Sequence, residues 1–309
     1  MRLPASNNNG RGERIRTFDP LVPNQMRYQA ALHPDSWYSN PPAIPIRHAL
    51  AIAMKKKQVL PWLEPDEPFP PAADAWGAGS EAPGLLAAGA DLSVDRLLQA
   101  YGHGIFPWFN AGQPILWWST DPRMVLKTAD FRLHRSLKKV LTQFVAASSC
   151  EIRFDSDFRG VIERCSQTPR NGQSGTWIVP EMVEAYTQLH AQGHAHSVET
   201  WIDGQQVGGL YCVAIGKAVF GESMFSHKTD ASKIALAALV AFCSAQNILA
   251  IDCQQNTRHL ASLGAKEVPR SVFLDLLKSC TGQAAVEWSF SPLYWSHILS
   301  IPSSCRDRP

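Results

Sequence analysis

What the chain lacks narrows its class before any motif is considered. Its seven cysteines are odd in number and include no CxxC pair, which argues against a disulfide framework and favours reduced, buried thiols. No apolar run approaches the roughly 18 residues that a membrane span requires, and residues 1–10 lack the hydrophobic core of an export signal. A net charge of +2 indicates no nucleic-acid partner by itself. With 309 residues, 45% of them hydrophobic, the sequence predicts a soluble intracellular protein of one large domain or two ordinary ones.

The N-terminal stretch differs from the rest of the chain. Residues 1–53 mix Asn and Arg with scattered prolines, and no apolar periodicity lasts long enough to define an element. Residues 10–20 resemble peptides produced by conceptual translation across bacterial tRNA-gene regions, in which case Met54 is the true start. We therefore expect residues 1–57 to be a disordered or non-native extension.

Polar residues follow two short apolar segments in the second half of the chain. One segment, 218–220, precedes Glu222, and another, 247–251, precedes Asp252 and Gln254. Both segments are typical of buried strands, so these polar side chains are expected at the ends of core strands. An unpaired buried charge is costly, so acids placed there need a partner or a function. The sequence therefore predicts a reaction centre at these residues.

The order of elements predicts an α+β fold. A strand at 196–202 and a returning strand at 206–215 form a hairpin, and a third strand leads to Glu222. A helix that Thr229 or Asp230 can cap then precedes the strand at 247–251. This order is that of a mixed sheet with flanking helices, as in the acetyl-CoA-dependent N-acetyltransferases.

The expected domains are a small N-terminal α/β domain over residues 58–122 and a C-terminal acyltransferase-like domain over 123–309. N-acetyltransferases hold the coenzyme A pyrophosphate on a glycine-bearing loop between the central strand and the helix. Residues 227–231 occupy that junction here and contain no glycine. The fold is therefore expected without coenzyme A, and no cofactor is predicted.

One aromatic cluster and one basic segment each admit two interpretations. Residues 104–109 and 115–119 carry Trp117, Trp118 and other aromatics, which form either core or the wall of a planar-ligand site. The segment 131–141 is an amphipathic helix pattern whose cations lack acidic partners four residues away, so its polar face is either solvated or a phosphate-binding strip. The cations are Arg132, Arg135, Lys138 and Lys139.

Two further patterns suggest chemistry that we do not predict. His194 and His196 form an HxH pair, but no Cys, His or carboxylate completes a recognisable ligand set nearby in the sequence, so no metal is expected. Cys253 lies beside Asp252, yet no basic partner that would activate a thiol is evident.

The motifs together resemble the leucyl/phenylalanyl-tRNA–protein transferase family. The match runs in order from about residue 60 to residue 273, and several long strings make chance agreement very improbable. The strings that carry it are residues 85–91, 104–109, 115–119, 175–178, 193–197, 221–226, 251–254 and 261–265.

This resemblance implies a bacterial cytoplasmic enzyme that uses neither a metal nor coenzyme A. Such an enzyme takes Leu or Phe, and Met less well, from Leu-tRNA or Phe-tRNA. It transfers the aminoacyl group to the α-amine of a protein that begins with Arg or Lys, and so marks that protein for degradation by the N-end rule. We expect a monomer by default. Two rival functions remain: an N-acyltransferase with another donor, and a non-catalytic tRNA-binding module.

By the same resemblance, Asp252 and Gln254 lie at the reaction centre. An α-amine has a pKa of about 7.7–8.0, so at neutral pH most of it must lose a proton before it attacks. An amide is hardly basic, so we expect the carbonyl oxygen of Gln254 to orient the α-ammonium. Asp252 would polarise the α-ammonium or accept its proton. Glu222 would add negative charge that also attracts the acceptor's Arg or Lys. The alternative for Asp252 is a buried ion pair or a helix cap.

The resemblance also implies an apolar pocket that rejects β-branched side chains by shape, and an aromatic platform for the terminal adenine of the tRNA. Trp117 or Trp118 is the expected platform, and the basic residues of segment 131–141 are expected along the acceptor stem. One departure stands out: the family commonly has Asn where this chain has Thr257, and Asn256 precedes it. The residues expected to bind the aminoacyl group or the adenosine are Trp117, Trp118, Leu210, Tyr211, Met224, Phe225 and Ser226.

Overall fold

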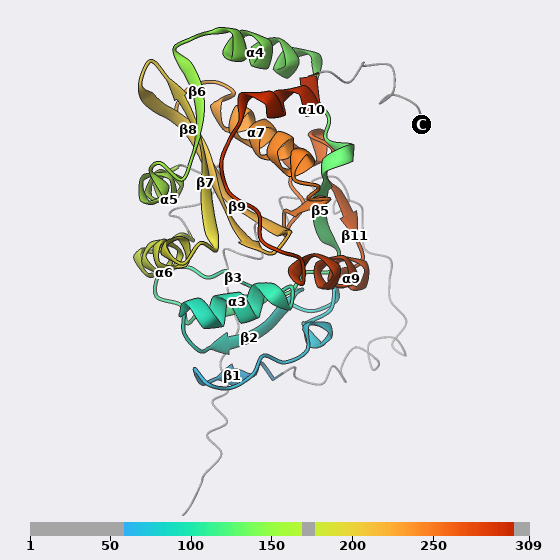
Figure 1. Cartoon of the computed structure of the whole chain (residues 1–309). Helices are drawn as coiled ribbons and strands as arrows, with labels where there is room; N and C mark the ends of the chain where they lie inside the picture. The colour runs from blue at the N-terminus through green and yellow to red at the C-terminus, as the bar shows by residue number, and fades with distance from the viewer. Residues whose placement is uncertain (1–58, 169–176, 300–309) are drawn as a thin grey trace, which may run out of the picture.

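The computed structural model describes residues 59–168 and 177–299, which form two sheets with helices packed around them (Figure 1). The extension expected at residues 1–57 lies outside the described residues. Within the described ranges, no helix is both long enough and apolar enough to cross a membrane.

The smaller sheet has four short strands in the order β1-β2-β4-β3. β1 and β2 are parallel, and the other neighbours are antiparallel. Helix α3 (Val94–Gly102) follows β2, and Ser93 caps it by accepting a hydrogen bond from the backbone N–H of Arg96. The strand bounds are Trp62–Leu63 (β1), Leu85–Gly89 (β2), Phe106–Pro107 (β3) and Leu116–Trp118 (β4).

The larger sheet has seven strands in the order β11-β5-β10-β9-β8-β7-β6. All neighbours are antiparallel except β9 and β10. The predicted hairpin is confirmed, because Asp203 and Gly204 both have the positive φ that a two-residue turn between strands favours. The bounds are Arg123–Lys127 (β5), Cys150–Phe154 (β6), Ala195–Ile202 (β7), Gln205–Ile215 (β8), Ala218–Ser226 (β9), Ala250–Asp252 (β10) and Lys266–Val268 (β11).

Helices lie on both faces of the larger sheet, which confirms the predicted α+β class (Figure 1). One face carries α5 (Phe158–Gln167) and α6 (Pro180–Ala191), with α3 and α9 (Arg270–Thr281) beside them. The other carries α7 (Ala231–Ala245), whose residues are nearly all buried because η3 and α10 cover it. The remaining helices are α4 (Arg135–Ala146), α8 (Arg258–Ser262) and α10 (Ser296–Leu299), and the 3-10 turns are η1 (Ala72–Asp74), η2 (Thr128–Asp130) and η3 (Pro292–Trp295).

The change from the smaller to the larger sheet falls between Trp118 and Arg123. The division into domains at residues 122 and 123 coincides with this change and stays a prediction. Helix α9 returns to pack against α3, so a segment that follows the larger sheet in the sequence also supports the smaller sheet (Figure 1).

A bulge and a strand divergence open the centre of the larger sheet. Tyr211 pairs with Ser223 and Cys212 pairs with Gly221, so Glu222 is the extra residue of a β-bulge. The parallel pairing of β9 with β10 ends at Phe220 and Asp252, whereas β9 continues to Ser226. Glu222 therefore emerges at a bulge inside its strand, and the expectation that it lies at a strand end was wrong.

One other local expectation needs correction. The helix expected at 131–141 begins only at Arg135, because the backbone N–H of Arg132 donates to the carbonyl of Leu263 instead. The segment 288–298 forms no strand. Trp288 stacks on His196 with ring centroids 4.0 Å apart, and the segment covers the α7 side of the sheet.

Candidate active site

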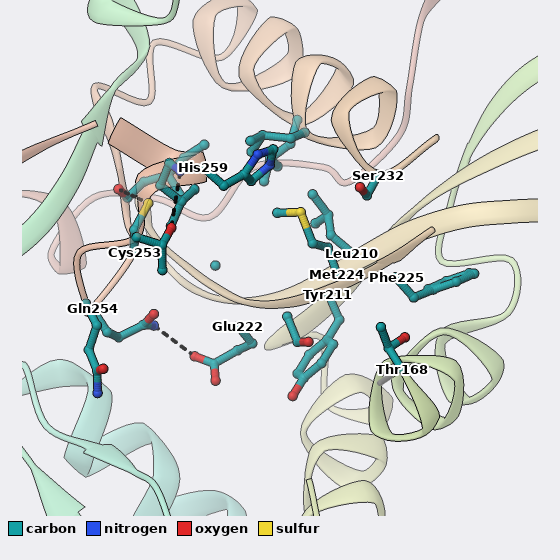
Figure 2. A pocket seen from close by; sticks show the side chains of 18 of the residues that line it. Thr168, Leu210, Tyr211, Glu222, Met224, Phe225, Ser232, Cys253, Gln254 and His259 are labelled. Atoms are coloured by element: carbon teal, nitrogen blue, oxygen red, sulfur yellow. Dashed lines mark hydrogen bonds between the residues drawn. The ribbon is translucent and has the colours of Figure 1, made fainter. Parts of the chain in front are cut away.

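A cavity of about 730 Å³ occupies the opening between β9 and β10 (Figure 2). β8 and β9 form its floor, and residues of α7, α8 and β3 contribute to its walls. The lining is largely apolar, with a short polar edge that contains Glu222 and Gln254. Of the side chains expected to bind the substrate, those that line the cavity are Leu210, Tyr211, Met224, Phe225 and Ser226.

Glu222 is held by neutral donors. Its Oε1 accepts a hydrogen bond from the hydroxyl of Tyr101 at 2.8 Å. The same oxygen accepts from Nε2 of Gln254 at 3.2 Å (Figure 2). Burial disfavours its charged form and raises its pKa to about 8; the hydrogen bond from Tyr101 opposes this shift, while nearby Asp252 adds to it. A carboxyl group with this pKa is suited to take and return a proton near neutral pH.

Gln254 occupies a constrained position directly after β10. Its φ is 52°, in the left-handed region that few non-glycine residues adopt. Its backbone N–H donates to Asp252, and its carbonyl accepts from the hydroxyl of Thr120 at 3.0 Å. Because its side-chain nitrogen donates to Glu222, the amide oxygen is the atom that this side chain offers to a cationic ligand.

Asp252 has a different environment from Glu222, although the two lie on neighbouring strands. Its carboxylate forms two hydrogen bonds with the guanidinium of Arg123, at 2.9 Å and 2.6 Å, and only 3% of its surface is exposed. Asp252 does not line the cavity, and its charge is balanced by this ion pair. What the structure shows directly is a support for the backbone of Gln254, and a proton-accepting role for Asp252 stays a prediction.

Sequence reasoning missed Arg123. The side chain is fully buried between the rings of Phe106 and Phe273, with centroid distances of 4.8 Å and 4.6 Å, and donates to the carbonyl of Gly104. No local pattern indicates this role, because the residues around Arg123 come from three separate stretches of the chain. The alternative that Asp252 forms a buried ion pair was open, but its partner was not identifiable.

The two expected tryptophan platforms do not reach the cavity. Trp117 is completely buried and donates to the carbonyl of Gly89, and Trp118 donates to the carbonyl of Trp108. Their strand β4 is packed inside the smaller sheet, so neither ring has a face open to a base. Trp108 and Trp177 line the cavity instead.

The expected basic strip lies on and before α4. Arg132 precedes the helix, while Arg135, Lys138 and Lys139 belong to it. Lys138 is half-buried and the others are exposed, and none of the four forms an ion pair with another described residue. The strip contributes nothing to the cavity, so any part it plays is in contacts with a large substrate.

Cys253 and Thr257, two uncertain residues of the sequence, have clear structural positions. Burial raises the pKa of the Cys253 thiol to about 12, which leaves it protonated and a poor nucleophile. Thr257 is the N-cap of α8, and its side chain accepts from the backbone N–H of Leu260 at 3.2 Å. Asn and Thr both serve as N-caps, which explains physically why Thr is tolerated at this position.

Within the described ranges, one cluster has the donor types of a metal site: Asp155, His190 and His196, with ligand atoms within 4.8 Å of one another. His194, the other half of the HxH pair, is not part of it. The carboxylate of Asp155 bonds to Nδ1 of His196 at 2.7 Å, and Nδ1 of His190 contacts the carbonyl of Ala195 at 2.8 Å. These contacts already use the nitrogens that would face an ion, and none of the three residues lines the cavity.

Comparisons with known proteins identify the family of the chain. A family model described as leucyl/phenylalanyl-tRNA protein transferase matches residues 125–278, and a model of its N-terminal domain matches residues 90–121. A leucyl/phenylalanyl-tRNA–protein transferase of Polaromonas sp. (strain JS666 / ATCC BAA-500) is 60% identical over 246 residues, which cover 80% of this chain and 96% of that protein. Another, from Albidiferax ferrireducens, is 58% identical over 244 residues, with 79% and 96% covered.

Among solved structures, a GCN5-related N-acetyltransferase from Kribbella flavida is similar at 10% identity, with 55% of this chain and 58% of that chain covered and a TM-score of 0.28. A likeness this distant adds nothing about the chemistry. The two curated relatives are covered almost completely and at high identity. The chain belongs to the leucyl/phenylalanyl-tRNA–protein transferase family and is an aminoacyltransferase.

Proposed function

We propose that this protein transfers Leu or Phe, and Met less well, from aminoacyl-tRNA to the α-amine of cytoplasmic proteins that begin with Arg or Lys, and so marks them for degradation. The observation that carries this proposal is the cavity itself. It joins an apolar interior to a polar edge, where Nε2 of Gln254 lies 3.2 Å from Oε1 of Glu222. This edge is suited to a reaction between an apolar acyl group and a cationic amine.

The apolar part of the cavity suits the aminoacyl side chain. Leu210, Met224 and Phe225 provide it, and Leu236 and Leu239 of α7 close it from the other side. Unbranched chains such as Leu, Phe and Met fit a narrow apolar pocket, whereas a misplaced methyl group costs about 1–3 kcal/mol.

The aromatic residues suit the 3′ end of the tRNA. Trp108 and Trp177 line the cavity, and a base stacked on such a ring gains about 1–3 kcal/mol. The basic strip of Arg132, Arg135, Lys138 and Lys139 would contact phosphates of the acceptor stem, a contact that different tRNAs can share.

The reaction needs little beyond positioning and one proton transfer, because the ester to tRNA is already activated. The α-ammonium gives a proton to Glu222, and its nitrogen forms a bond to the ester carbonyl carbon. The bond from that carbon to the ribose oxygen then breaks, and Glu222 returns the proton to this oxygen. The nitrogen releases its second proton to water as the amide forms. An α-amine pKa of about 7.7–8.0 is close to that of Glu222, so the transfer between them is nearly balanced.

The polar edge of the cavity also accounts for the proposed preference for acceptors that begin with Arg or Lys. Glu222 is the one carboxylate among the described lining residues, and its negative form attracts both the α-ammonium and a nearby Arg or Lys. Gln254 fixes the orientation of the ammonium through its amide oxygen. Asp252 acts through Gln254, since it holds the backbone of that residue.

The test measures transfer of [¹⁴C]Leu from Leu-tRNA to a peptide that begins with Arg, beside the same peptide beginning with Gly. Wild type should label the Arg peptide only. Glu222→Gln should lower the rate by about 10²–10⁴, the usual contribution of a general base. The matched control is Glu184→Gln, an exposed residue of α6, which should keep the wild-type rate. Labelling of both peptides, or of neither, would refute the proposed specificity, and full activity of Glu222→Gln would refute the assigned base.

A further inference from the structure

Two tyrosines behind Glu222 take no part in the steps described above. Tyr101 belongs to α3 and Tyr186 to α6, and both side chains are fully buried. Their hydroxyls hydrogen-bond to each other, and Tyr101 also donates to Oε1 of Glu222 at 2.8 Å. Neither tyrosine lines the cavity. The carboxylate is therefore supported from the side that faces away from the substrate.

The two rings are fixed by their surroundings. Tyr101 packs on Phe220 with centroids 5.0 Å apart, and Tyr186 packs edge-to-face on Tyr211 at 5.6 Å. Phe would fill the same apolar space without bringing a polar group into the core. A buried hydroxyl is costly unless it has a partner, and here the partners are the other tyrosine and Glu222.

The direction of these hydrogen bonds follows from the protons available. Burial raises the pKa of both hydroxyls well above the usual value, so each keeps its proton near neutral pH. Tyr101 gives its proton to the ionised Glu222, and Tyr186 contacts both Tyr101 and Glu222. The hydrogen bonds of both hydroxyls lower the pKa of Glu222, that of Tyr101 more than that of Tyr186.

The two protein donors meet the same carboxylate oxygen. Tyr101 and Nε2 of Gln254 both donate to Oε1 of Glu222. A carboxylate held through one oxygen by two donors has a fixed plane, and its second oxygen remains for a ligand. Oε2 is then the atom that can meet the α-ammonium of an acceptor.

We propose that Tyr101 and Tyr186 are positioning residues of the transfer reaction: they fix Glu222 through Oε1 and so present Oε2 to the attacking amine. The inference rests on the proposed function of Glu222. It also makes α3, a helix packed with the smaller sheet, part of the reaction centre.

Removal of the tyrosine hydroxyls should change how Glu222 titrates. Donors to the charged form lower a carboxyl pKa, so their loss raises the pKa of Glu222 above about 8. The other groups that face Glu222 stay in place in such variants. They are Asp252 of β10, Gln254 directly after β10, Arg123 of β5 and Cys212 of β8.

The experiment compares single-turnover transfer between pH 6 and pH 9 for wild type, Tyr101→Phe and Tyr186→Phe, with one acceptor peptide so that its own titration is common to all. We expect Tyr101→Phe to be about tenfold slower at pH 7, the effect of one pKa unit, with the difference closing as the pH rises. Tyr186→Phe should show a smaller shift in the same direction. KM for aminoacyl-tRNA should not change. Tyr294→Phe, which removes a hydroxyl bonded to Gln246 outside the cavity, should match wild type.

A second readout needs no activity. In protein labelled with [¹³C]glutamate, the carboxyl signal lost in Glu222→Gln identifies Glu222, and its titration should move to higher pH in Tyr101→Phe. An equal rate loss at every pH, or an unchanged titration, would overturn the proposal. If Glu222→Gln transfers like wild type while the titration still moves, the proposed base is refuted instead, so the two failures are distinguishable.

Discussion

Asp252 and Glu222 lie on neighbouring parallel strands, yet their environments differ. Asp252 is paired with Phe220 of the neighbouring strand, whereas Glu222 lies two residues beyond Phe220, at the bulge. Asp252 lies beside the buried guanidinium of Arg123, which balances its negative charge and donates two hydrogen bonds to it. Glu222 meets the neutral donors Tyr101 and Gln254 at the edge of a cavity. A matched charge is inert, whereas an unmatched one can gain or lose a proton. The comparison separates the carboxylate that supports the site from the one that is available for chemistry.

The largest expected effect is on stability, when the matched pair is broken. Asp252→Ala leaves the guanidinium of Arg123 buried without a counter-charge, which should lower the free energy of unfolding by about 3–5 kcal/mol. Urea denaturation measures it, and Asp275→Ala, an exposed position on α9, is the control. The double variant Arg123→Met, Asp252→Leu should be less destabilised than the single one. A single variant as stable as wild type would show that the pair is not a structural unit.

The unmatched carboxylate of Glu222 should destabilise the folded protein, and the size of this effect on the free energy of unfolding should depend on pH. The pKa of Glu222 is raised from about 4.5 to about 8 in the folded protein, so its contribution to stability is full below pH 4.5 and is lost as the pH rises to 8. Glu222→Gln has no such loss. Its unfolding free energy relative to wild type should increase by about 3–4 kcal/mol between pH 5 and pH 8.5. Thermal unfolding across this range tests the sign, and a pH-independent difference would contradict the raised pKa.

The smallest expected effect concerns Cys253, which lies between Asp252 and Gln254 in the sequence. Cys253 lines the cavity, but its thiol is protonated and donates only to the carbonyl of Ile251. Cys253→Ser should therefore retain transfer activity within about twofold of wild type, because the chemistry requires no thiolate. Transfer of [¹⁴C]Leu from Leu-tRNA to the Arg peptide measures it. A loss comparable with that of Glu222→Gln would return the thiol to the mechanism.

Local patterns were sufficient where neighbours in the sequence determine the structure. The cap at Ser93, the first turn of α6 at Pro180 and the hairpin at Asp203-Gly204 all depend on a few consecutive residues. The start of α4 was misplaced because a backbone hydrogen bond from Arg132 to the distant Leu263 competes with the helix. The two tryptophans were misassigned for a related reason, since a short aromatic string does not reveal which ring faces inward.

The sequence by itself determined the α+β class, the family and the residues at the polar edge of the cavity, because apolar periodicity, turn chemistry and short motifs are local properties of the chain. Only the tertiary structure decided which acid is matched by Arg123, which tryptophans reach the cavity, and that Tyr101 and Tyr186 support Glu222. These contacts join residues up to 129 positions apart. Their energies depend on burial and on the bulge that turns Glu222 aside, and neither can be read from neighbouring residues.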